Sequence, residues 1–182
     1  MSYKIWLFIA IGIFMLGIVL GLAMPDAIAD LLAEDLAALG ELGAALEPFQ
    51  LTTAAFIFLK NVSALLFSFI LSPILCLAPI TALAVNGWLL AFVSVTVLEQ
   101  YSLGFLLGGL LPHGILELPA LVIGEAAALS TGAMVIMAVV SRQKRGQLKL
   151  HLMRVARYLM LAFALLLPAA IIETYITPLL LR

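Results

Sequence analysis

A histidine and a glutamate stand four residues apart within a long apolar stretch, where His113 is followed by Glu117. On a helix this spacing places the two side chains on one face. An imidazole and a carboxylate on one face could bind a metal ion, carry a proton, or hydrogen-bond a polar group of a partner. Ionisable side chains cost about 3 kcal/mol each at membrane depth, so their presence indicates a bundle interior or a wet cavity.

Two prolines and a glycine surround this pair. Pro112 and Gly114 flank the histidine, and Pro119 follows the glutamate by two residues. Proline lacks a backbone donor and kinks a helix, and the carbonyls that it frees inside a membrane need protein or water as a partner. We therefore predict a broken helix here, with polar groups of neighbouring helices packed against it.

Other polar residues lie in the middle of apolar runs and are candidate neighbours of the broken helix. Lys60 and Asn61 interrupt one run, Asn86 interrupts the next, and Glu125 follows two turns after the first glutamate. We predict one intramembrane polar site made of His113, Glu117, Asn61, Lys60, Asn86 and Glu125, with the helix break at Pro112, Gly114 and Pro119.

Three functional interpretations of this site compete with a structural one. A zinc hydrolase is disfavoured because the only other histidine is His151 and no His-Glu-x-x-His pattern occurs. A proton or ion path and a notch that receives a partner's polar group both fit the residue types. The structural interpretation is a polar lock, in which Glu117 pairs with Lys60 and His113 caps the pair. We expect the lock, because no reaction requires these residues at this spacing.

The composition places the chain in the membrane. Its 182 residues are 65% hydrophobic and 10% charged, whereas soluble domains are nearer half apolar and a quarter charged. No glycine-rich phosphate loop, nucleophile elbow or Rossmann fingerprint occurs, and the aromatic residues lie in apolar runs, so we expect no nucleic-acid partner. We predict no catalytic residue, no cofactor and no bound metal, and hence no enzyme.

Five apolar runs are long enough to cross about 30 Å of hydrocarbon, at residues 5–24, 51–71, 74–98, 114–140 and 158–181. Residues 102–111 are too short to cross and predict a re-entrant or half-length helix. Residues 26–46 repeat leucines at helical spacing with acids opposite, which is typical of an amphipathic interfacial helix. The predicted fold class is an all-α polytopic membrane helical bundle forming one transmembrane domain over residues 1–182.

The charges predict an orientation in the cell membrane. Residues 141–157 carry six of the nine Lys and Arg residues and should be cytoplasmic, which also places the N-terminus in the cytoplasm and the acidic residues 26–46 outside. If residues 102–111 crossed the membrane, the acidic segment would be cytoplasmic instead. The glycines of the first run predict close helix contacts and self-association, most simply as a dimer; they are Gly12, Gly17 and Gly21.

Two passages resemble the stage II sporulation protein M family of integral membrane proteins. The first runs from Phe58-Leu59-Lys60-Asn61 through Asn86-Gly87-Trp88-Leu89-Leu90. The second is Leu111-Pro112-His113-Gly114-Ile115-Leu116-Glu117-Leu118-Pro119-Ala120, followed by small residues and Gly132. The family typically has an Asn-Asn pair in the first passage and Pro-His-Gly-x-x-Glu in the second. The resemblance covers roughly residues 50–180, and Lys60 departs from it by replacing the first asparagine. The matching positions are Asn61, Asn86, Gly87, Pro112, His113, Gly114 and Glu117.

This resemblance implies a membrane scaffold. In endospore formers the family works with peptidoglycan-degrading partners during engulfment, but its members also look widespread in organisms that never sporulate. We therefore expect a membrane-embedded scaffold or assembly factor whose partners are the lipid bilayer, a second copy of itself and other membrane or envelope proteins. The alternative is a transporter or channel for an ion or small solute that uses His113 and Glu117, and the third reading is an intramembrane metal-dependent hydrolase.

Overall fold

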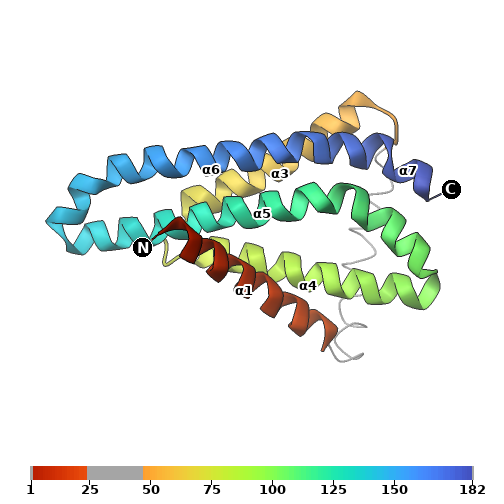
Figure 1. Cartoon of the computed structure of the whole chain (residues 1–182), viewed down its shortest axis with the longest axis horizontal. Helices are drawn as coiled ribbons and strands as arrows, with labels where there is room; N and C mark the ends of the chain where they lie inside the picture. Colours follow the sequence, from red (N-terminus) through yellow and green to blue (C-terminus); the bar gives the residue numbers. More distant parts are fainter. Residues whose placement is uncertain (1, 24–46, 182) are drawn as a thin grey trace.

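The computed structural model of the protein describes residues 2–23 and 47–181. These residues form six helices and no strand, which confirms the all-α expectation (Figure 1). The helices are α1 (Tyr3–Leu22), α3 (Leu51–Leu71), α4 (Leu77–Gln100), α5 (Leu103–Val140), α6 (Arg142–Tyr175) and α7 (Thr177–Leu180). The amphipathic helix expected over residues 26–46 lies outside the described residues.

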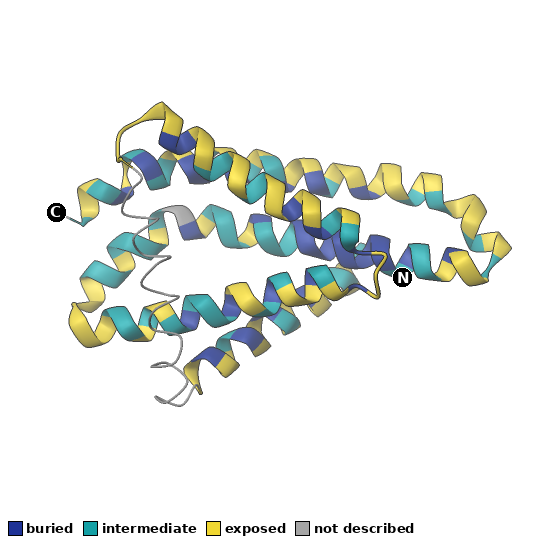
Figure 2. Ribbon diagram, turned by 180° about the vertical axis from the view of Figure 1, so that it is seen from behind, coloured by how far each residue is buried: buried dark blue, intermediate teal, exposed yellow. Residues whose placement is uncertain are grey.

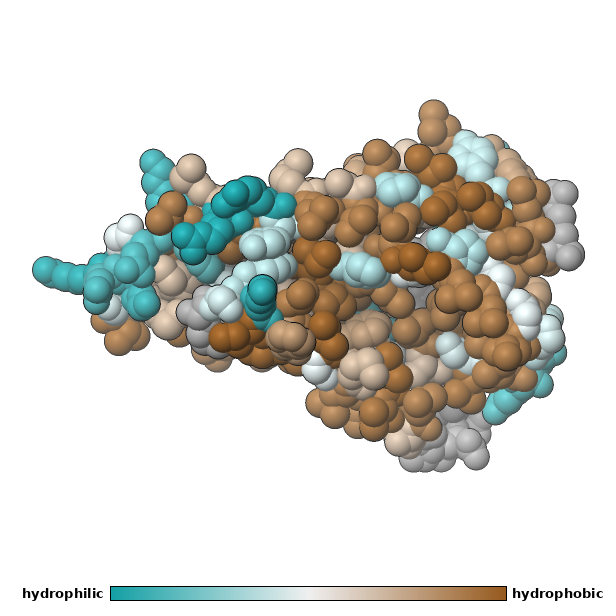
Figure 3. Space-filling model, in the orientation of Figure 1, coloured by the Kyte–Doolittle hydropathy of each residue, from teal (hydrophilic) through white to brown (hydrophobic). Residues whose placement is uncertain are grey.

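The surface of the bundle is apolar over most of its length. Five of the helices are long and apolar enough to cross a membrane, and large side chains such as Phe8 and Phe67 are exposed on them. Figure 3 shows hydrophobic residues covering the body of the molecule, with hydrophilic residues gathered at one tapered end. Because exposed apolar surface of this extent is unfavourable in water, these helices belong in a bilayer.

Helix α5 is the centre of the bundle. It contacts α1, α3, α4, α6 and α7, and 61% of its most apolar stretch is buried, against 17–33% for the other spans. Small residues make this close packing possible, because they let neighbouring backbones approach. Figure 2 shows buried residues gathered in the interior between the helices. One buried stripe along α5 consists of Ala120, Gly124, Ala127 and Thr131.

The half-length segment expected at residues 102–111 is part of α5 rather than a separate helix. The side chain of Ser102 caps the helix by accepting a hydrogen bond from the Phe105 amide over 3.2 Å. The helix then continues through Pro112 and Pro119, and its first part lies at a marked angle to the rest (Figure 1). Each proline removes only one intrahelical hydrogen bond, so the helix bends without ending. Leu103–Pro112 is therefore a short apolar part of α5 and is not among the five helices long enough to cross a membrane.

Helix α4 begins three residues later than the sequence indicated, at Leu77 instead of Ile74. Leu75 and Cys76 adopt left-handed conformations, with φ angles of 51° and 57°. A left-handed residue interrupts the right-handed helical path. The connection between α3 and α4 is therefore a tight turn over residues 72–76, and α4 can run back along the bundle.

Helix α6 joins the basic segment to the last span without a break. Its 34 residues correspond to a length of about 51 Å, well beyond the ~30 Å of a hydrocarbon core. Arg145 closes the turn before it, donating hydrogen bonds to the carbonyls of Ala138 (2.7 Å) and Val139 (2.8 Å) at the end of α5. The N-terminus lies toward this α5–α6 end of the molecule, and the C-terminus lies at the opposite end (Figure 1).

Helices α1 and α4 cross with their backbones in close contact. A Cβ atom at Gly17 would lie 2.3 Å from the carbonyl oxygen of Ala84, and one at Gly87 would lie 2.2 Å from that of Phe14. Gly21 packs similarly against α4, whereas a Cβ at Gly12 would meet nothing within 4 Å. The predicted close contacts therefore form at Gly17 and Gly21, and within the described chain they do not form at Gly12.

Candidate functional site: an intramembrane polar cavity

Two adjoining cavities of about 300 and 420 Å³ lie between α3, α4 and α5. We refer to them together as the intramembrane cavity. Lys60, Asn86 and Glu117 line both parts, and Asn61 and Glu125 line the smaller part. The structure therefore brings five of the six predicted site residues to one place. Leucines from α3, α4 and α5 make up most of the remaining wall.

Glu117 is held by an asparagine of the neighbouring helix. The side-chain amide of Asn61 donates a hydrogen bond to Glu117 Oε1 over 3.2 Å, and both side chains are half-buried. A hydrogen bond within a protein is worth about 1 kcal/mol net. This contact joins the middle of α3 to the part of α5 that contains the two prolines.

Glu125 is more deeply buried than Glu117, with only 1% of its surface exposed. The Ser68 hydroxyl of α3 donates a hydrogen bond to Glu125 Oε2. A buried carboxyl group without a partner is strongly destabilising, so Ser68 offsets part of the cost of placing this group inside the bundle. The two glutamates thus face one cavity from the same helix, each with its own partner on α3.

Lys60 does not form the ion pair that the polar lock required. Its side chain is exposed at the middle of α3 and makes no hydrogen bond or ion pair with another described residue. Adjacent residues on a helix point about 100° apart, so Asn61 bonds to Glu117 of α5 while Lys60 lines the cavity without bonding to it. The expected Lys60–Glu117 pair is therefore replaced by the bond from Asn61.

Asn86 lies across the cavity from α3, on α4. Its side-chain amide donates to the carbonyl of Ala82 in its own helix over 2.8 Å. The asparagine is exposed, and it does not bond to either glutamate. It contributes polarity to the wall of the cavity and no link between helices.

The helix-break residues are all within α5, so the break is a bend. Gly114 is buried and Pro112 half-buried, and the backbone of His113 is helical between them. The side chain of His113 lies outside the described part of the structure. Of the predicted His113–Glu117 pair, only the glutamate side chain is therefore described. Pro119 has no amide hydrogen to donate to the carbonyl of Ile115, one turn earlier.

Ser68 is the site residue that the sequence prediction missed. Asn61, Leu65 and Ser68 recur every three or four residues on one face of α3, Ser72 follows directly after its end, and each packs against α5. Leu65 lies where a Cβ at Gly124 would be, and the residue after α3, Ser72, lies where a Cβ at Gly132 would be. Residue numbers therefore rise in the same direction along both helices, so α3 and α5 run parallel. The sequence spacing could have revealed it. Ser68 follows Asn61 by two helical turns on α3, and Glu125 follows Glu117 by about two turns on α5, so the two pairs can face each other.

The described side chains can present a cation, two carboxyl groups and two amides to one intramembrane space. Among these described side chains, no group of three or more His, Cys, Asp or Glu residues is placed to hold a metal ion. The cavity suits a guest that carries an anionic or hydrogen-bonding group, because Lys60 offers a charge that no described residue neutralises.

Comparison with known proteins agrees with the two sequence passages. No curated protein and no solved structure matches the chain. The sequence model of the family described as Stage II sporulation protein M matches residues 8–178. The match extends beyond both passages and includes most of α1 and all of α6. The chain therefore belongs to the Stage II sporulation protein M family of membrane proteins.

Proposed function

We propose that this protein is a non-enzymatic membrane scaffold or assembly factor that receives a polar group of another membrane protein in the intramembrane cavity. The observation that carries the proposal is Lys60, a cation at the middle of a membrane-spanning helix with no described partner. A lysine at this depth is costly when it is alone, and an incoming acidic or hydrogen-bonding side chain would offset that cost.

The shape of the site supports a lateral partner. Lys60 and Asn86 are exposed on α3 and α4, so the mouth of the cavity opens on the side of the bundle, between two spans. Glu117 and Glu125 are fixed behind it by Asn61 and Ser68. A transmembrane helix of a partner could therefore place a polar residue beside Lys60 while its apolar residues contact the leucines of the wall.

Photo-crosslinking from the cavity tests this proposal. A photoreactive residue at Ala64, which lines the cavity, should form a covalent adduct with a distinct membrane protein in native membranes. The matched control is Phe67, which is exposed on the same helix and does not line the cavity. Lys60→Gln should abolish the Ala64 adduct. Adducts that contain only lipid, or only a second copy of this chain, would count against the scaffold.

A proton- or ion-conducting role is the second candidate, and the paired glutamates favour it. Glu117 and Glu125 line one cavity and are about 12 Å apart along α5, from the rise of a helix. Carboxyl groups placed in sequence through a membrane interior are typical of proton paths. Purified protein in vesicles should then dissipate a pH or ion gradient, and Glu125→Gln should stop it. Vesicles that hold their gradients would remove this candidate.

An intramembrane metal-dependent hydrolase is the third reading, based on His113 and Glu117. Elemental analysis after mild purification tests it directly. A stoichiometric transition metal that is lost in Glu117→Ala would favour the hydrolase over the scaffold. Protein without bound metal would remove it.

A further inference from the structure

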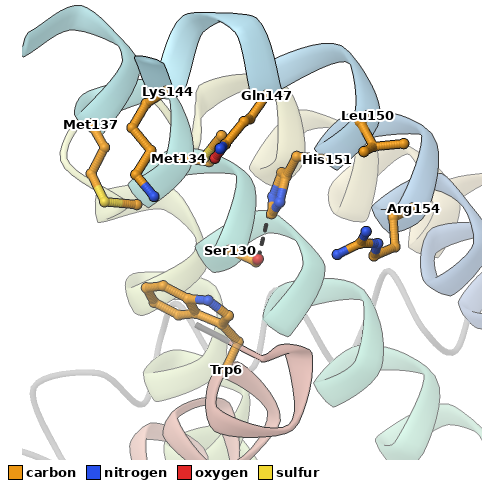
Figure 4. Close-up of a pocket in the computed structure, with 9 residues that line it drawn as sticks. All are labelled: Trp6, Ser130, Met134, Met137, Lys144, Gln147, Leu150, His151 and Arg154. Atoms are coloured by element: carbon orange, nitrogen blue, oxygen red, sulfur yellow. Dashed lines mark hydrogen bonds between the residues drawn. The ribbon is translucent and has the colours of Figure 1, made fainter. Parts of the chain in front are cut away.

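A separate cavity of about 330 Å³ lies at the basic end of the molecule, between α1, α5 and α6 (Figure 4). We refer to it as the basic cavity. Lys144, His151 and Arg154 of α6 line one side, and Ser130 of α5 lies opposite them. Trp6 of α1 lies beneath these groups in Figure 4. This cavity shares no lining residue with the intramembrane cavity.

The basic cavity is positively charged, and no acidic residue that lines it neutralises this charge. Its lining contains a lysine and an arginine but no aspartate or glutamate. The side chains of Lys144 and Arg154 make no hydrogen bond or ion pair with another described residue. Arg145, by contrast, donates two hydrogen bonds to carbonyl groups at the end of α5. Two cations therefore remain available to a ligand, while their neighbour in the sequence stabilises the turn.

The spacing of the polar residues on α6 directs their side chains into the basic cavity. Lys144, Gln147, His151 and Arg154 stand at intervals of three or four residues, which places them on one face of the helix. The buried Ser130 hydroxyl lies 3.4 Å from His151 Nε2, and Lys144 and Arg154 reach inward from either side of this pair (Figure 4). Hydroxyl, imidazole, ammonium and guanidinium groups can all donate hydrogen bonds to a phosphate.

The other wall of the basic cavity is apolar. Met134 and Met137 of α5 and Trp6 form it, and tryptophan is enriched at the boundary between headgroups and acyl chains. Thioether side chains adapt well to irregular apolar ligands. One cavity thus combines donors for a phosphate with a surface for hydrocarbon, which is the arrangement that an amphiphile requires.

We propose that the basic cavity binds the phosphate group of an anionic phospholipid, with Lys144 and Arg154 as the principal contacts. Ser130 and His151 supply hydrogen bonds to the same headgroup, and Trp6 with the two methionines packs against the glycerol and the start of the acyl chains. The positive-inside rule places this end at the cytoplasmic leaflet, where anionic lipids attract basic groups. A free phosphate or soluble phosphate ester has the same chemistry and is the competing source.

Lipid retention by variants of equal charge tests the proposal. The cavity variant is Lys144→Gln with Arg154→Gln, and the control is Lys149→Gln with Arg157→Gln, which removes two exposed cations outside the cavity. Native mass spectrometry would measure bound phosphatidylglycerol after purification from vesicles of phosphatidylglycerol and phosphatidylcholine. The cavity variant should bind about tenfold more weakly, a change of about 1.4 kcal/mol, and the control should match the unmodified protein.

Two further measurements distinguish a lipid phosphate from a soluble phosphate as the bound group. Inorganic phosphate and glycerol phosphate, titrated in detergent, should not displace the bound lipid. Displacement by either one, lost in the cavity variant, would overturn the lipid assignment in favour of a soluble phosphate. Equal weakening in both double variants would overturn the site, because it would show attraction by net charge alone. If the double variant misfolds, Lys144→Gln alone should still weaken lipid binding, since this side chain is only half-buried at the surface.

Discussion

The Asn61 amide and the Glu117 carboxylate are joined by a hydrogen bond of 3.2 Å across α3 and α5. The sequence resemblance matches both residues to the family's motifs, and the structure shows them in direct contact. Lys60, the residue that departs from the family, stands next to this bond and takes no part in it. The hydrogen bond and the unpaired cation are therefore separate features of one cavity.

We expect Glu117→Gln to be tolerated better than Glu117→Ala. The glutamine keeps an oxygen that can accept from Asn61, whereas alanine leaves the half-buried amide without its partner at a cost of about 1 kcal/mol. Thermal unfolding in detergent would measure the difference. In an Asn61→Ala background the two substitutions should become equivalent, and equal destabilisation in the unmodified background would contradict the bond's contribution.

Removing the hydroxyl of Ser68 should destabilise the bundle. Ser68→Ala deprives the buried Glu125 carboxyl of its donor, and we expect a loss of about 1–3 kcal/mol in the free energy of unfolding. Ser63, exposed on the same helix, provides the control, since Ser63→Ala should change stability little. A similar small effect at both positions would show that Glu125 finds another partner.

A methyl group should be costly at Gly87 and harmless at Gly12. Gly87→Ala would push its Cβ to 2.2 Å from the Phe14 carbonyl oxygen, and the backbones of α1 and α4 must separate at a cost of about 1–3 kcal/mol. Gly12→Ala adds a methyl group in open space and should be neutral or mildly stabilising, because alanine favours helices. Denaturant unfolding would compare the two. Destabilisation by Gly12→Ala would reveal a contact of α1 beyond the described chain.

The guanidinium of Arg145 should be required to hold the α5–α6 turn. Arg145→Lys cannot reproduce two separate donors to the carbonyls of Ala138 and Val139, so amide hydrogen exchange at this turn should accelerate several-fold. Arg142→Lys serves as the control, since the Arg142 side chain is exposed and makes no bond to a described residue. Unchanged exchange in Arg145→Lys would mean that packing alone holds the turn.

The single cysteine should react slowly and with a displaced pH profile. Burial raises the pKa of the Cys76 thiol above its usual value, and an acid with a raised pKa has less thiolate at any given pH. The rate of maleimide labelling should therefore be lower than that of a free thiol at neutral pH and should rise only at more alkaline pH. Labelling in denaturant gives the reference rate, and an equal rate in the folded protein would contradict the burial.

The five long apolar helices were predictable because each contains a continuous apolar run, and runs of this length have few structures available in a bilayer. Their ends were less predictable. The start of α4 depends on the left-handed conformations of Leu75 and Cys76, which neither residue type favours. The proline positions predicted a break in α5, but only packing decides whether the helix bends or ends.

Which polar groups pair was also beyond the sequence. Lys60 and Asn61 are both suitable partners for a glutamate, and the rotation of α3 about its axis decides between them. That rotation follows from side-chain packing such as that of Leu65 against Gly124, which depends on the whole α3–α5 contact. Gathering the polar residues into one cavity was predictable, because membrane-buried polar groups avoid lipid.

The intramembrane cavity opens toward the side of the bundle, and this determines how the concentration of a guest should be expressed. A guest that enters between α3 and α4 comes from the plane of the bilayer, so its abundance is a surface density and not a molar concentration in water. Confinement to the same thin layer raises the frequency of encounters, much as a tether does. A contact around Lys60 that would be too weak to detect between soluble proteins can therefore be well populated in the membrane.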